Sequence, residues 1–215
     1  MKKLLGLFAA LVFSASTFAV ELQENVHYQI IDKKSQGTAK PEIKEFFSYY
    51  CPHCKTFEPL AKKLKDRADA EGYKFVKSHV DFLRGASPEI QMMLTKALIT
   101  SEKLNVPQVN DAIFNYIQTQ RAAITGEKDI RNLFLINGVD GKKFDKVFNS
   151  FAVVAAAKKM KKEQDSLANK RILTGVPTFI VNGKYKLINN GFDAKSYGDL
   201  FTKLEEAAIE LSKKK

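Results

Sequence analysis

The sequence predicts an α/β fold that is interrupted by a block of inserted helices. Three observations support this prediction: a strand–helix–strand pattern in residues 42–82, helical periodicity alone in residues 87–170, and a β-hairpin followed by one helix near the end of the chain. A strand–helix–strand unit forms two parallel strands, and a hairpin forms two antiparallel strands. The two ends of the chain are therefore expected to build one domain around the helices.

Residues 1–19 have the features of a secretory signal peptide. A methionine and two lysines precede an apolar stretch, residues 4–13, which is too short to span a bilayer. Thr17 and Ala19 are small residues at the positions expected for a cleavage site, so the mature chain is expected to begin at Val20. A buried core segment or an uncleaved anchor is the alternative interpretation.

The net charge of +11 comes from 35 basic and 24 acidic residues. Such a balance favours acidic partners or anionic membrane surfaces. However, the lysines are scattered along the polar faces of the predicted helices and end in the run Lys213, Lys214 and Lys215, which is typical of a solvated tail. Because an exported protein has little access to nucleic acid, we do not expect nucleic-acid binding.

The chain has only two cysteines, Cys51 and Cys54, separated by two residues. A disulfide that closes so small a loop adds little stability, even in an exported protein, whose compartment preserves disulfides. The alternative, half of a zinc site, requires four ligands, and the histidines of the chain do not fall at zinc-finger spacings. We therefore interpret the pair as a redox centre that uses no metal or other cofactor.

The first half of the predicted domain contains three strands and one helix. Residues 26–31 form a short lead strand, and residues 42–48 are apolar on both faces, as a central strand requires. Residues 52–70 have leucines at helical spacing, and residues 74–82 return to strand character. Because Cys51 directly follows the central strand, it is expected at the N-terminus of the helix.

Residues 87–170 form the predicted inserted helical domain. The clearest periodicity has apolar residues at i, i+3, i+4, i+7 and i+10, namely Phe144, Val147, Phe148, Phe151 and Val154. Gly126, Gly138 and Gly141 are expected to mark breaks between helices, and Thr125 is a candidate N-cap.

Residues 178–181 and 185–188 are predicted strands joined by an Asn-Gly turn at 182–183, the strongest hairpin signal in the sequence. A last helix follows, and its apolar face consists of Tyr197, Leu200, Phe201, Leu204 and Leu211. Residues 20–86 and 171–215 are therefore expected to form one domain.

Cys51 has the more reactive position of the two cysteines. At a helix N-terminus, unpaired N–H groups and the positive end of the helix dipole stabilise a thiolate and lower its pKa. Cys54 lies one turn deeper, where its thiol can donate a hydrogen bond to that thiolate. His53 is expected to stabilise the thiolate further, and Pro52 completes the Cys-Pro-His-Cys motif.

Stabilisation of the Cys51 thiolate determines the expected direction of the reaction. It favours the reduced pair, which makes the disulfide a stronger oxidant, so we expect the pair to donate its disulfide. A substrate thiolate would attack Cys51, release Cys54 and form a mixed disulfide, and a second substrate thiol would then displace Cys51.

The residues around the two cysteines resemble those of DsbA-type periplasmic thiol:disulfide oxidoreductases. The resemblance extends along nearly the whole mature chain and rests on two stretches, Glu45-Phe46-Phe47-Ser48-Tyr49-Tyr50-Cys51-Pro52-His53-Cys54 and Gly175-Val176-Pro177. It implies a thioredoxin fold with a helical domain inserted between the βαβ and ββα halves. Within the thioredoxin superfamily, Cys-Pro-His-Cys is typical of the oxidising branch.

The resemblance implies further site residues. Val176 and Pro177 are expected to form a cis peptide that faces the disulfide and leaves the Val176 backbone free to pair with an extended substrate; an ordinary trans proline is the alternative. Glu45 and Lys77 interrupt neighbouring apolar strands, so we expect both to lie buried beneath the active site as a charge pair. The resemblance implies that they and Glu58 tune the thiols and relay protons. Exposure at a strand edge is the alternative for Glu45 and Lys77.

The predicted function is that of an exported oxidase, located in the periplasm, that donates the Cys51–Cys54 disulfide to reduced, newly translocated proteins. The resemblance also implies a quinone-linked inner-membrane protein that reoxidises the pair, and we expect a monomer. Two alternatives remain open: a reductase or isomerase that uses the same cysteines, and a peptide-binding chaperone in which the disulfide is inert.

Overall fold

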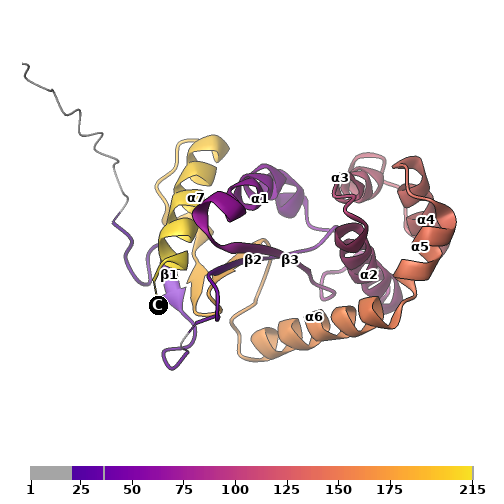
Figure 1. Cartoon of the computed structure of the whole chain (residues 1–215). Coiled ribbons are helices and arrows are strands. Elements are labelled where there is room, and N and C mark those ends of the chain that lie inside the picture. Colours follow the sequence, from indigo (N-terminus) through magenta and orange to yellow (C-terminus); the bar gives the residue numbers. More distant parts are fainter. Residues whose placement is uncertain (1–20, 36, 215) are drawn as a thin grey trace, which may run out of the picture.

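The computed structural model describes residues 21–35 and 37–214 of the chain (Figure 1). Its strands are β1 (Tyr28–Ile30), β2 (Glu42–Phe47), β3 (Lys74–His79), β4 (Thr178–Val181) and β5 (Tyr185–Leu187). Its α-helices are α1 (Pro52–Glu71), α2 (Pro88–Leu104), α3 (Gln108–Phe114), α4 (Glu127–Ile136), α5 (Gly141–Phe148), α6 (Phe151–Asn169) and α7 (Tyr197–Ser212). A π-helical turn, η1 (Asn115–Thr119), continues α3, and a 3-10 turn, η2 (Asn189–Gly191), follows β5. The predicted signal peptide lies outside the described residues.

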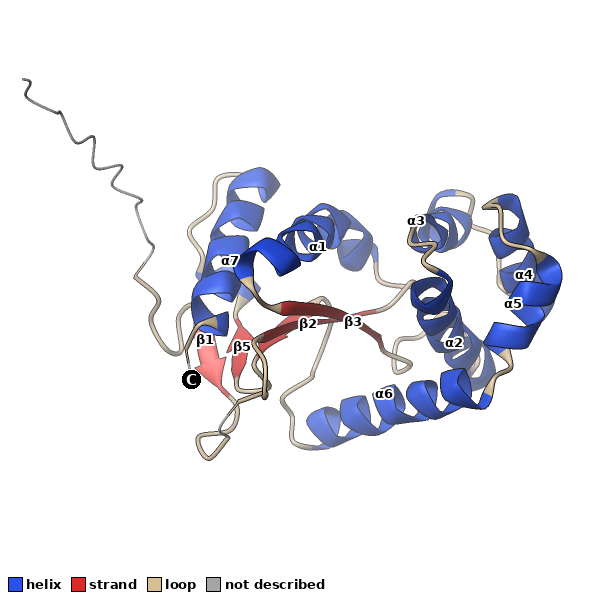
Figure 2. Cartoon of the chain, viewed as in Figure 1, coloured by secondary structure: helices blue, strands red, loops and turns tan. Residues whose placement is uncertain are grey.

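The described strands form one five-stranded sheet in the order β1-β5-β4-β2-β3 (Figure 2). β2 and β3 are parallel, whereas the pairs β2–β4, β4–β5 and β1–β5 are antiparallel. Helices α1 and α7 lie on one face of the sheet, and α6 passes along the opposite face (Figure 1). The two ends of the chain therefore meet in one sheet, which confirms the predicted α/β fold. None of the helices within residues 21–35 and 37–214 has the length and hydrophobicity needed to cross a membrane.

The helix that carries the cysteine motif begins and ends at residues with special backbone properties. α1 starts with Pro52, whose missing N–H has no partner to lose in a first helical turn. The helix ends where Gly72 adopts a left-handed conformation with a φ of 74°. The following strand, β3, ends at His79 rather than at the predicted residue 82, because its parallel partner β2 ends at Phe47.

The hairpin between β4 and β5 forms as predicted. Val181 pairs with Tyr185 across the turn, and Asn182 and Gly183 have φ values of 52° and 61°. Two successive positive φ angles are what a type I′ turn requires, and Asn-Gly adopts them at little cost. β4 pairs with β2, with Thr178 opposite Phe46, so the loop before β4, which contains Pro177, lies beside the loop after β2 that leads to Cys51.

The periodicity from Phe144 to Val154 spans a helix break that the pattern did not predict. α5 ends at Phe148, and Ser150 begins α6 as an N-cap whose hydroxyl accepts a hydrogen bond from a backbone N–H. Phe151 is consequently 87% exposed rather than buried. The N-cap at Ser150 therefore separates α5 from α6, although the apolar periodicity continues through this position.

The glycines of the insertion mark helix ends as predicted, but the cap of α4 differs from the prediction. Gly126 precedes α4, Gly138 follows it, and Gly141 begins α5. Thr125 is not the N-cap, because Gly126 occupies that position. Thr125 instead donates its N–H and its hydroxyl to the Asp129 carboxylate, each at 2.7 Å.

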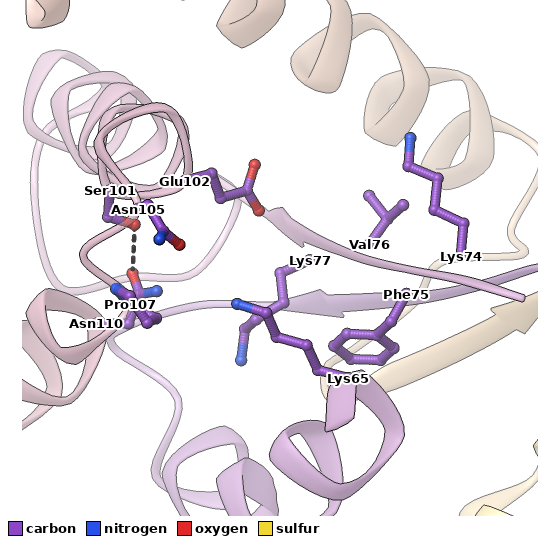
Figure 3. Close-up of a pocket in the computed structure, with 10 residues that line it drawn as sticks. All are labelled: Lys65, Lys74, Phe75, Val76, Lys77, Ser101, Glu102, Asn105, Pro107 and Asn110. Carbon is purple, nitrogen blue, oxygen red and sulfur yellow. Dashed lines mark hydrogen bonds between the residues drawn. The ribbon is translucent and has the colours of Figure 1, made fainter. Parts of the chain in front are cut away.

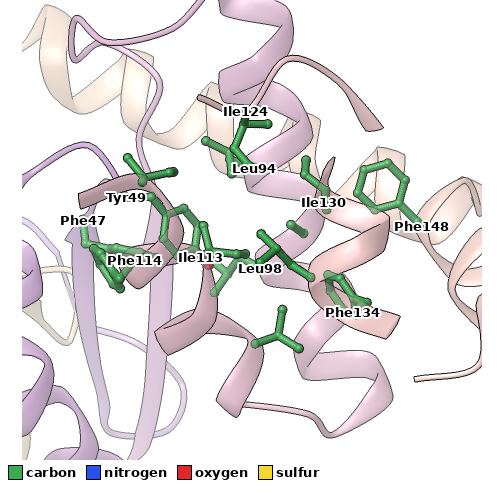
Figure 4. Close-up of a cluster of buried hydrophobic side chains, with 14 of the residues drawn as sticks. Phe47, Tyr49, Leu94, Leu98, Ile113, Phe114, Ile124, Ile130, Phe134 and Phe148 are labelled. Atoms are coloured by element: carbon green, nitrogen blue, oxygen red, sulfur yellow. The ribbon is translucent and has the colours of Figure 1, made fainter. Parts of the chain in front are cut away.

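One buried apolar cluster joins the sheet to the inserted helices α2 to α5 (Figure 4). Phe47 and Tyr49, from the end of β2 and the loop after it, pack against Phe114 of α3, with ring centroids 5.9 and 5.0 Å apart. Cys51 and Cys54 belong to the same cluster. The cysteines thus lie where the sheet meets the helices, so both parts of the molecule shape their surroundings.

Candidate active site

Cys51 is the N-cap of α1, as its place after the central strand predicts. Its sulfur accepts a hydrogen bond from the Cys54 N–H at 3.1 Å. Cys51 is 5% exposed, whereas Cys54 is completely buried. Because both are free thiols here, the structure describes the reduced pair, in which Cys51 is slightly exposed and Cys54 is not exposed at all.

The surroundings of the two sulfurs shift their pKa values in opposite directions. A hydrogen bond from the Cys54 thiol is the main cause that lowers the Cys51 pKa to about 7; burial opposes it, and the backbone N–H groups of Cys54 and His53 add to it. Burial raises the pKa of Cys54, and the same hydrogen bond raises it further. His53 therefore acts on the thiolate through its backbone, while its side chain and Pro52 are exposed.

Replacing Cys54 with alanine should raise the pKa of Cys51 above about 7, because the largest stabilising hydrogen bond is lost. Ultraviolet absorbance of the thiolate during a pH titration measures this directly. Cys54→Ser is the matched control, since its hydroxyl can still donate, and it should shift the Cys51 pKa less. An unchanged pKa in Cys54→Ala would mean that backbone N–H groups and the helix dipole stabilise the thiolate alone.

The loop before β4 reaches the active-site sulfur. The Val176–Pro177 peptide bond is cis, as the family resemblance implies, and the alternative of a trans proline is wrong. The Cys51 thiol donates a hydrogen bond to the Val176 carbonyl oxygen at 3.4 Å, and the Asn189 side chain donates to the Pro177 carbonyl at 3.0 Å. Residues separated by more than a hundred positions therefore border the same sulfur.

Glu45, Lys77 and Glu58 form one charge cluster beneath the cysteines. Glu45 of β2 and Lys77 of β3 are partners in the parallel register, and the Lys77 ammonium lies 3.0 Å from the Glu45 carboxylate. Lys77 also donates a hydrogen bond to Glu58 of α1. Glu45 is completely buried and Glu58 is 8% exposed, so a solvent-facing position at a strand edge is wrong for Glu45. The structure therefore brings together the three ionisable residues implied by the resemblance.

This cluster holds a carboxyl group that titrates near neutral pH. Burial raises the pKa of Glu45 to about 7, although the charge of Lys77 lowers it in part. Burial opposes the charge of Lys77, but the attraction of Glu45 and Glu58 outweighs it and raises the Lys77 pKa. Repulsion from Glu45 also contributes to the raised pKa of Cys54. The carboxyl group and the buried thiol are thus electrostatically linked.

A cavity of about 290 Å³ lies between the edge strand β3, α1 and the end of α2 (Figure 3). Its lining residues are Lys65, Lys74, Phe75, Val76, Lys77, Ser101, Glu102, Asn105, Pro107 and Asn110. Lys77 therefore borders both the cavity and the buried carboxylates. Neither cysteine lines the cavity, so we do not assign it to the redox chemistry.

The contacts of His79, which lies next to the cluster, indicate a structural role. His79 is buried, its Nδ1 lies 2.9 Å from the Thr95 hydroxyl, and its ring stacks on Tyr49. Burial lowers its pKa to about 3, so the ring is neutral at physiological pH. Within residues 21–35 and 37–214, no group of three or more His, Cys, Asp or Glu side chains is arranged to hold a metal ion.

One residue at the site was not identified from the sequence. The side-chain amide of Gln118, in the π-turn η1, donates hydrogen bonds to the carbonyl oxygens of Tyr49 and Cys51, at 2.7 and 3.0 Å. A polar residue in a helical segment far from the cysteine motif has no local signal for such a contact. Only the packing of η1 against the loop after β2 reveals it.

Sequence comparisons place the chain in a known family. Residues 42–108 and 94–205 match the model of the DSBA-like thioredoxin domain. The thiol:disulfide interchange protein DsbA of Yersinia pestis is 34% identical over 213 residues, which cover 94% of this chain and 97% of that protein. DsbA of Escherichia coli strain K12 is 32% identical over 219 residues, which cover 100% of both chains.

Solved structures agree with this assignment. The crystal structure of the disulfide oxidoreductase DsbA from Proteus mirabilis has a TM-score of 0.74 at 30% identity and covers 89% of this chain and 97% of that chain. DsbA from Klebsiella pneumoniae has a TM-score of 0.76 at 25% identity, covering 91% of this chain and 100% of its own. These likenesses confirm the thioredoxin fold implied by the sequence. The chain therefore belongs to the family of DsbA-like thioredoxin proteins and is a disulfide-forming protein thiol:disulfide oxidoreductase.

Proposed function

We propose that this oxidoreductase acts in the periplasm as an oxidase that donates the Cys51–Cys54 disulfide to reduced exported proteins. The observation that carries the proposal is the asymmetry of the reduced pair: the pKa of Cys51 is lowered to about 7, and that of Cys54 is raised. Because the surroundings stabilise the Cys51 thiolate, they favour the reduced pair and hence transfer of the disulfide to a substrate.

The reaction proceeds through a mixed disulfide. A substrate thiolate attacks the Cys51 sulfur of the oxidised pair, the bond between Cys51 and Cys54 breaks, and Cys54 leaves with the electron pair. A second substrate thiolate then attacks the substrate sulfur of the mixed disulfide, and Cys51 leaves as a thiolate. The substrate loses two electrons and gains a disulfide, while the enzyme pair is reduced. Exposure supports attack at Cys51, because Cys54 is completely buried.

Val176 and Pro177 are the proposed substrate-binding loop. The Val176 carbonyl oxygen lies within hydrogen-bonding distance of the Cys51 sulfur, so a peptide that pairs with this backbone would lie beside the reacting bond. A cysteine-to-serine variant of Proteus mirabilis DsbA has been solved with a non-covalently bound peptide. The substrate we propose is accordingly an extended cysteine-containing segment of an unfolded exported protein.

Glu45 is the proposed proton donor and acceptor for Cys54, with Lys77 and Glu58 as its electrostatic partners. A thiolate that forms at Cys54 must take up a proton, because burial raises its pKa. Glu45 has a pKa of about 7, so both of its protonation states are populated near neutral pH. His53 and Pro52, both within the motif, are proposed to set the potential of the pair.

The proposed oxidase must be reoxidised after each turnover. Following the family resemblance, we propose a quinone-linked inner-membrane protein as the oxidant. We also propose a monomer as the working form. A reductase or isomerase would use the same cysteines at a lower potential, and a chaperone would bind peptides without disulfide exchange. The direction of the equilibrium between the pair and a thiol buffer separates these candidates.

The deciding experiment equilibrates the pair with glutathione buffers and then traps the free thiols. We expect a potential more oxidising than about −180 mV, which is that of protein disulfide isomerase. A potential near or below about −270 mV, in the range of thioredoxin, would contradict the oxidase proposal and support a reductase. Because the buffer replaces the substrate, the measurement requires no knowledge of the natural clients.

A further inference from the structure

Gln118 links the inserted helices to the active-site loop. α3 runs directly into the π-turn η1, which closes with a hydrogen bond from the Gln120 N–H to the Asn115 carbonyl at 2.9 Å. π-Turns are rare, and they are frequent at functional sites because the extra residue redirects the side chains that follow. Here the half-buried Gln118 points its amide at the backbone between Tyr49 and Cys51.

In the loop that Gln118 contacts, the backbone carbonyl groups have few other hydrogen-bond donors. The Tyr50 N–H donates to the Ser48 hydroxyl at 3.2 Å, and the Cys51 N–H donates to the Ser48 carbonyl at 3.0 Å. Those bonds hold the N–H groups of the loop. Gln118 holds two of its carbonyl groups, one on each side of Tyr50, with a single amide nitrogen.

The same contact affects charge near the sulfur. A carbonyl oxygen carries a partial negative charge, and the Gln118 amide brings the partial positive charge of its N–H groups to the carbonyls of Tyr49 and Cys51. The Cys51 carbonyl also accepts the Lys55 N–H of the first helical turn at 3.2 Å. An amide that donates to both carbonyls offsets their partial charge and keeps the peptide planes in place.

We propose that Gln118 is a positioning residue: its amide holds the backbone of Tyr49 and Cys51 from the inserted helices and thereby orients the Cys51 sulfur for disulfide exchange. This inference rests on the proposed function for its role in turnover, but the contact itself concerns the reduced pair. It gives the helical insertion a part in setting the redox properties of the cysteines.

Thr119 provides a matched control from the neighbouring position. The Lys55 ammonium of α1 donates a hydrogen bond to the Thr119 hydroxyl, so this pair also ties η1 to the cysteine-bearing helix. Thr119 makes no hydrogen bond to the backbone between Tyr49 and Cys51 among the described residues. Thr119→Val therefore removes a hydrogen bond between η1 and α1 without releasing the carbonyls of Tyr49 and Cys51.

The test compares Gln118→Met, which keeps the side-chain length but cannot donate, with Thr119→Val. Thiolate titration by ultraviolet absorbance and equilibration with glutathione are measured on the full chain. We expect Gln118→Met to raise the pKa of Cys51 and to make the pair less oxidising by about five- to tenfold in its equilibrium constant, because both hydrogen bonds to the loop carbonyls are lost. Thr119→Val should change neither quantity by more than about twofold.

Gln118→Glu provides a second variant of the same shape. Its carboxylate repels both carbonyls and the thiolate, so the shifts should exceed those of Gln118→Met. Gln118 variants that fold and match the wild type in both measurements would overturn the proposal, as would equal shifts in Thr119→Val. A low, reducing potential of the wild-type cysteine pair would overturn the oxidase function instead. The effect of the Gln118 variants on the Cys51 pKa and on the redox equilibrium would still be measurable in that case.

Discussion

Cys51→Ser should abolish oxidation of a reduced test substrate, and Cys54→Ala whose Cys51 is first joined to glutathione in a disulfide should trap a single-cysteine substrate as a mixed disulfide. With a serine at position 51 the enzyme cannot form its disulfide, so the substrate thiolate has no sulfur–sulfur bond to attack. In this form of Cys54→Ala, the substrate thiolate attacks the Cys51 sulfur and glutathione leaves as a thiolate. A substrate with one cysteine has no second thiol to displace Cys51, so the mixed disulfide persists. Gain of a test disulfide and non-reducing electrophoresis measure the two outcomes.

A chaperone would give a different pattern. Peptide binding without exchange would persist in Cys51→Ser, and aggregation of an unfolded client would be suppressed as in the wild type. Pro52→Ala serves as a control that changes the motif but keeps both sulfurs, and it should retain measurable oxidation. Oxidation in Cys51→Ser at the wild-type rate would show that disulfide formation in the substrate does not require Cys51, which would contradict the mixed disulfide at Cys51.

Lys77→Met should lower the free energy of unfolding by about 3 kcal/mol above neutral pH, because it leaves Glu45 buried without its cation. Burial already raises the pKa of Glu45 to about 7, and removing Lys77 should raise it further. The loss should therefore be large at about pH 8 and small at about pH 5, where Glu45 is protonated in both proteins. Urea denaturation of the reduced protein at the two pH values measures it.

The sign of the pH dependence follows from the direction of the Glu45 shift. Because the folded-state pKa lies above the value of 4.5 for an ordinary glutamate, Glu45 favours folding when it is protonated. Its contribution is fully present below 4.5 and is lost as the pH rises through about 7. Glu45→Gln should remove this dependence, and Glu45→Gln/Lys77→Met should recover most of the stability lost in Lys77→Met. An equal loss at both pH values would point to lost packing of the Lys77 stem instead.

Local signals in the sequence were sufficient to predict the main strands and helices of the molecule. Interactions between near neighbours determine β2, the helix after Cys51 and the Asn-Gly turn at 182–183. Each of these elements could therefore be predicted from the sequence without the tertiary structure. The helix break at Ser150 shows the limit of this approach. Apolar periodicity continued through it, and a single capping hydroxyl ended one helix and began the next.

The family resemblance extended the prediction to residues distant in the chain. It implied that Pro177 faces the cysteines, while the interruption of two apolar strands predicted a charge pair between Glu45 and Lys77, and the structure contains both arrangements. Spacing and composition alone left each of these residues with an ordinary alternative: a trans proline, or charges exposed at a strand edge.

Two properties of the site depended on the tertiary structure alone. The pKa of Glu45 depends on how completely two strands and a helix exclude water from one carboxylate, and burial is a property of the whole fold. The contact of Gln118 with the Cys51 carbonyl depends on where the π-turn places an amide in space. The sequence by itself therefore determined the fold class, the reactive cysteines and the type of reaction, because these follow from local pattern and chemistry. Only the tertiary structure decided which distant groups surround the sulfurs, because desolvation and hydrogen bonding between distant segments exist only after the chain has packed.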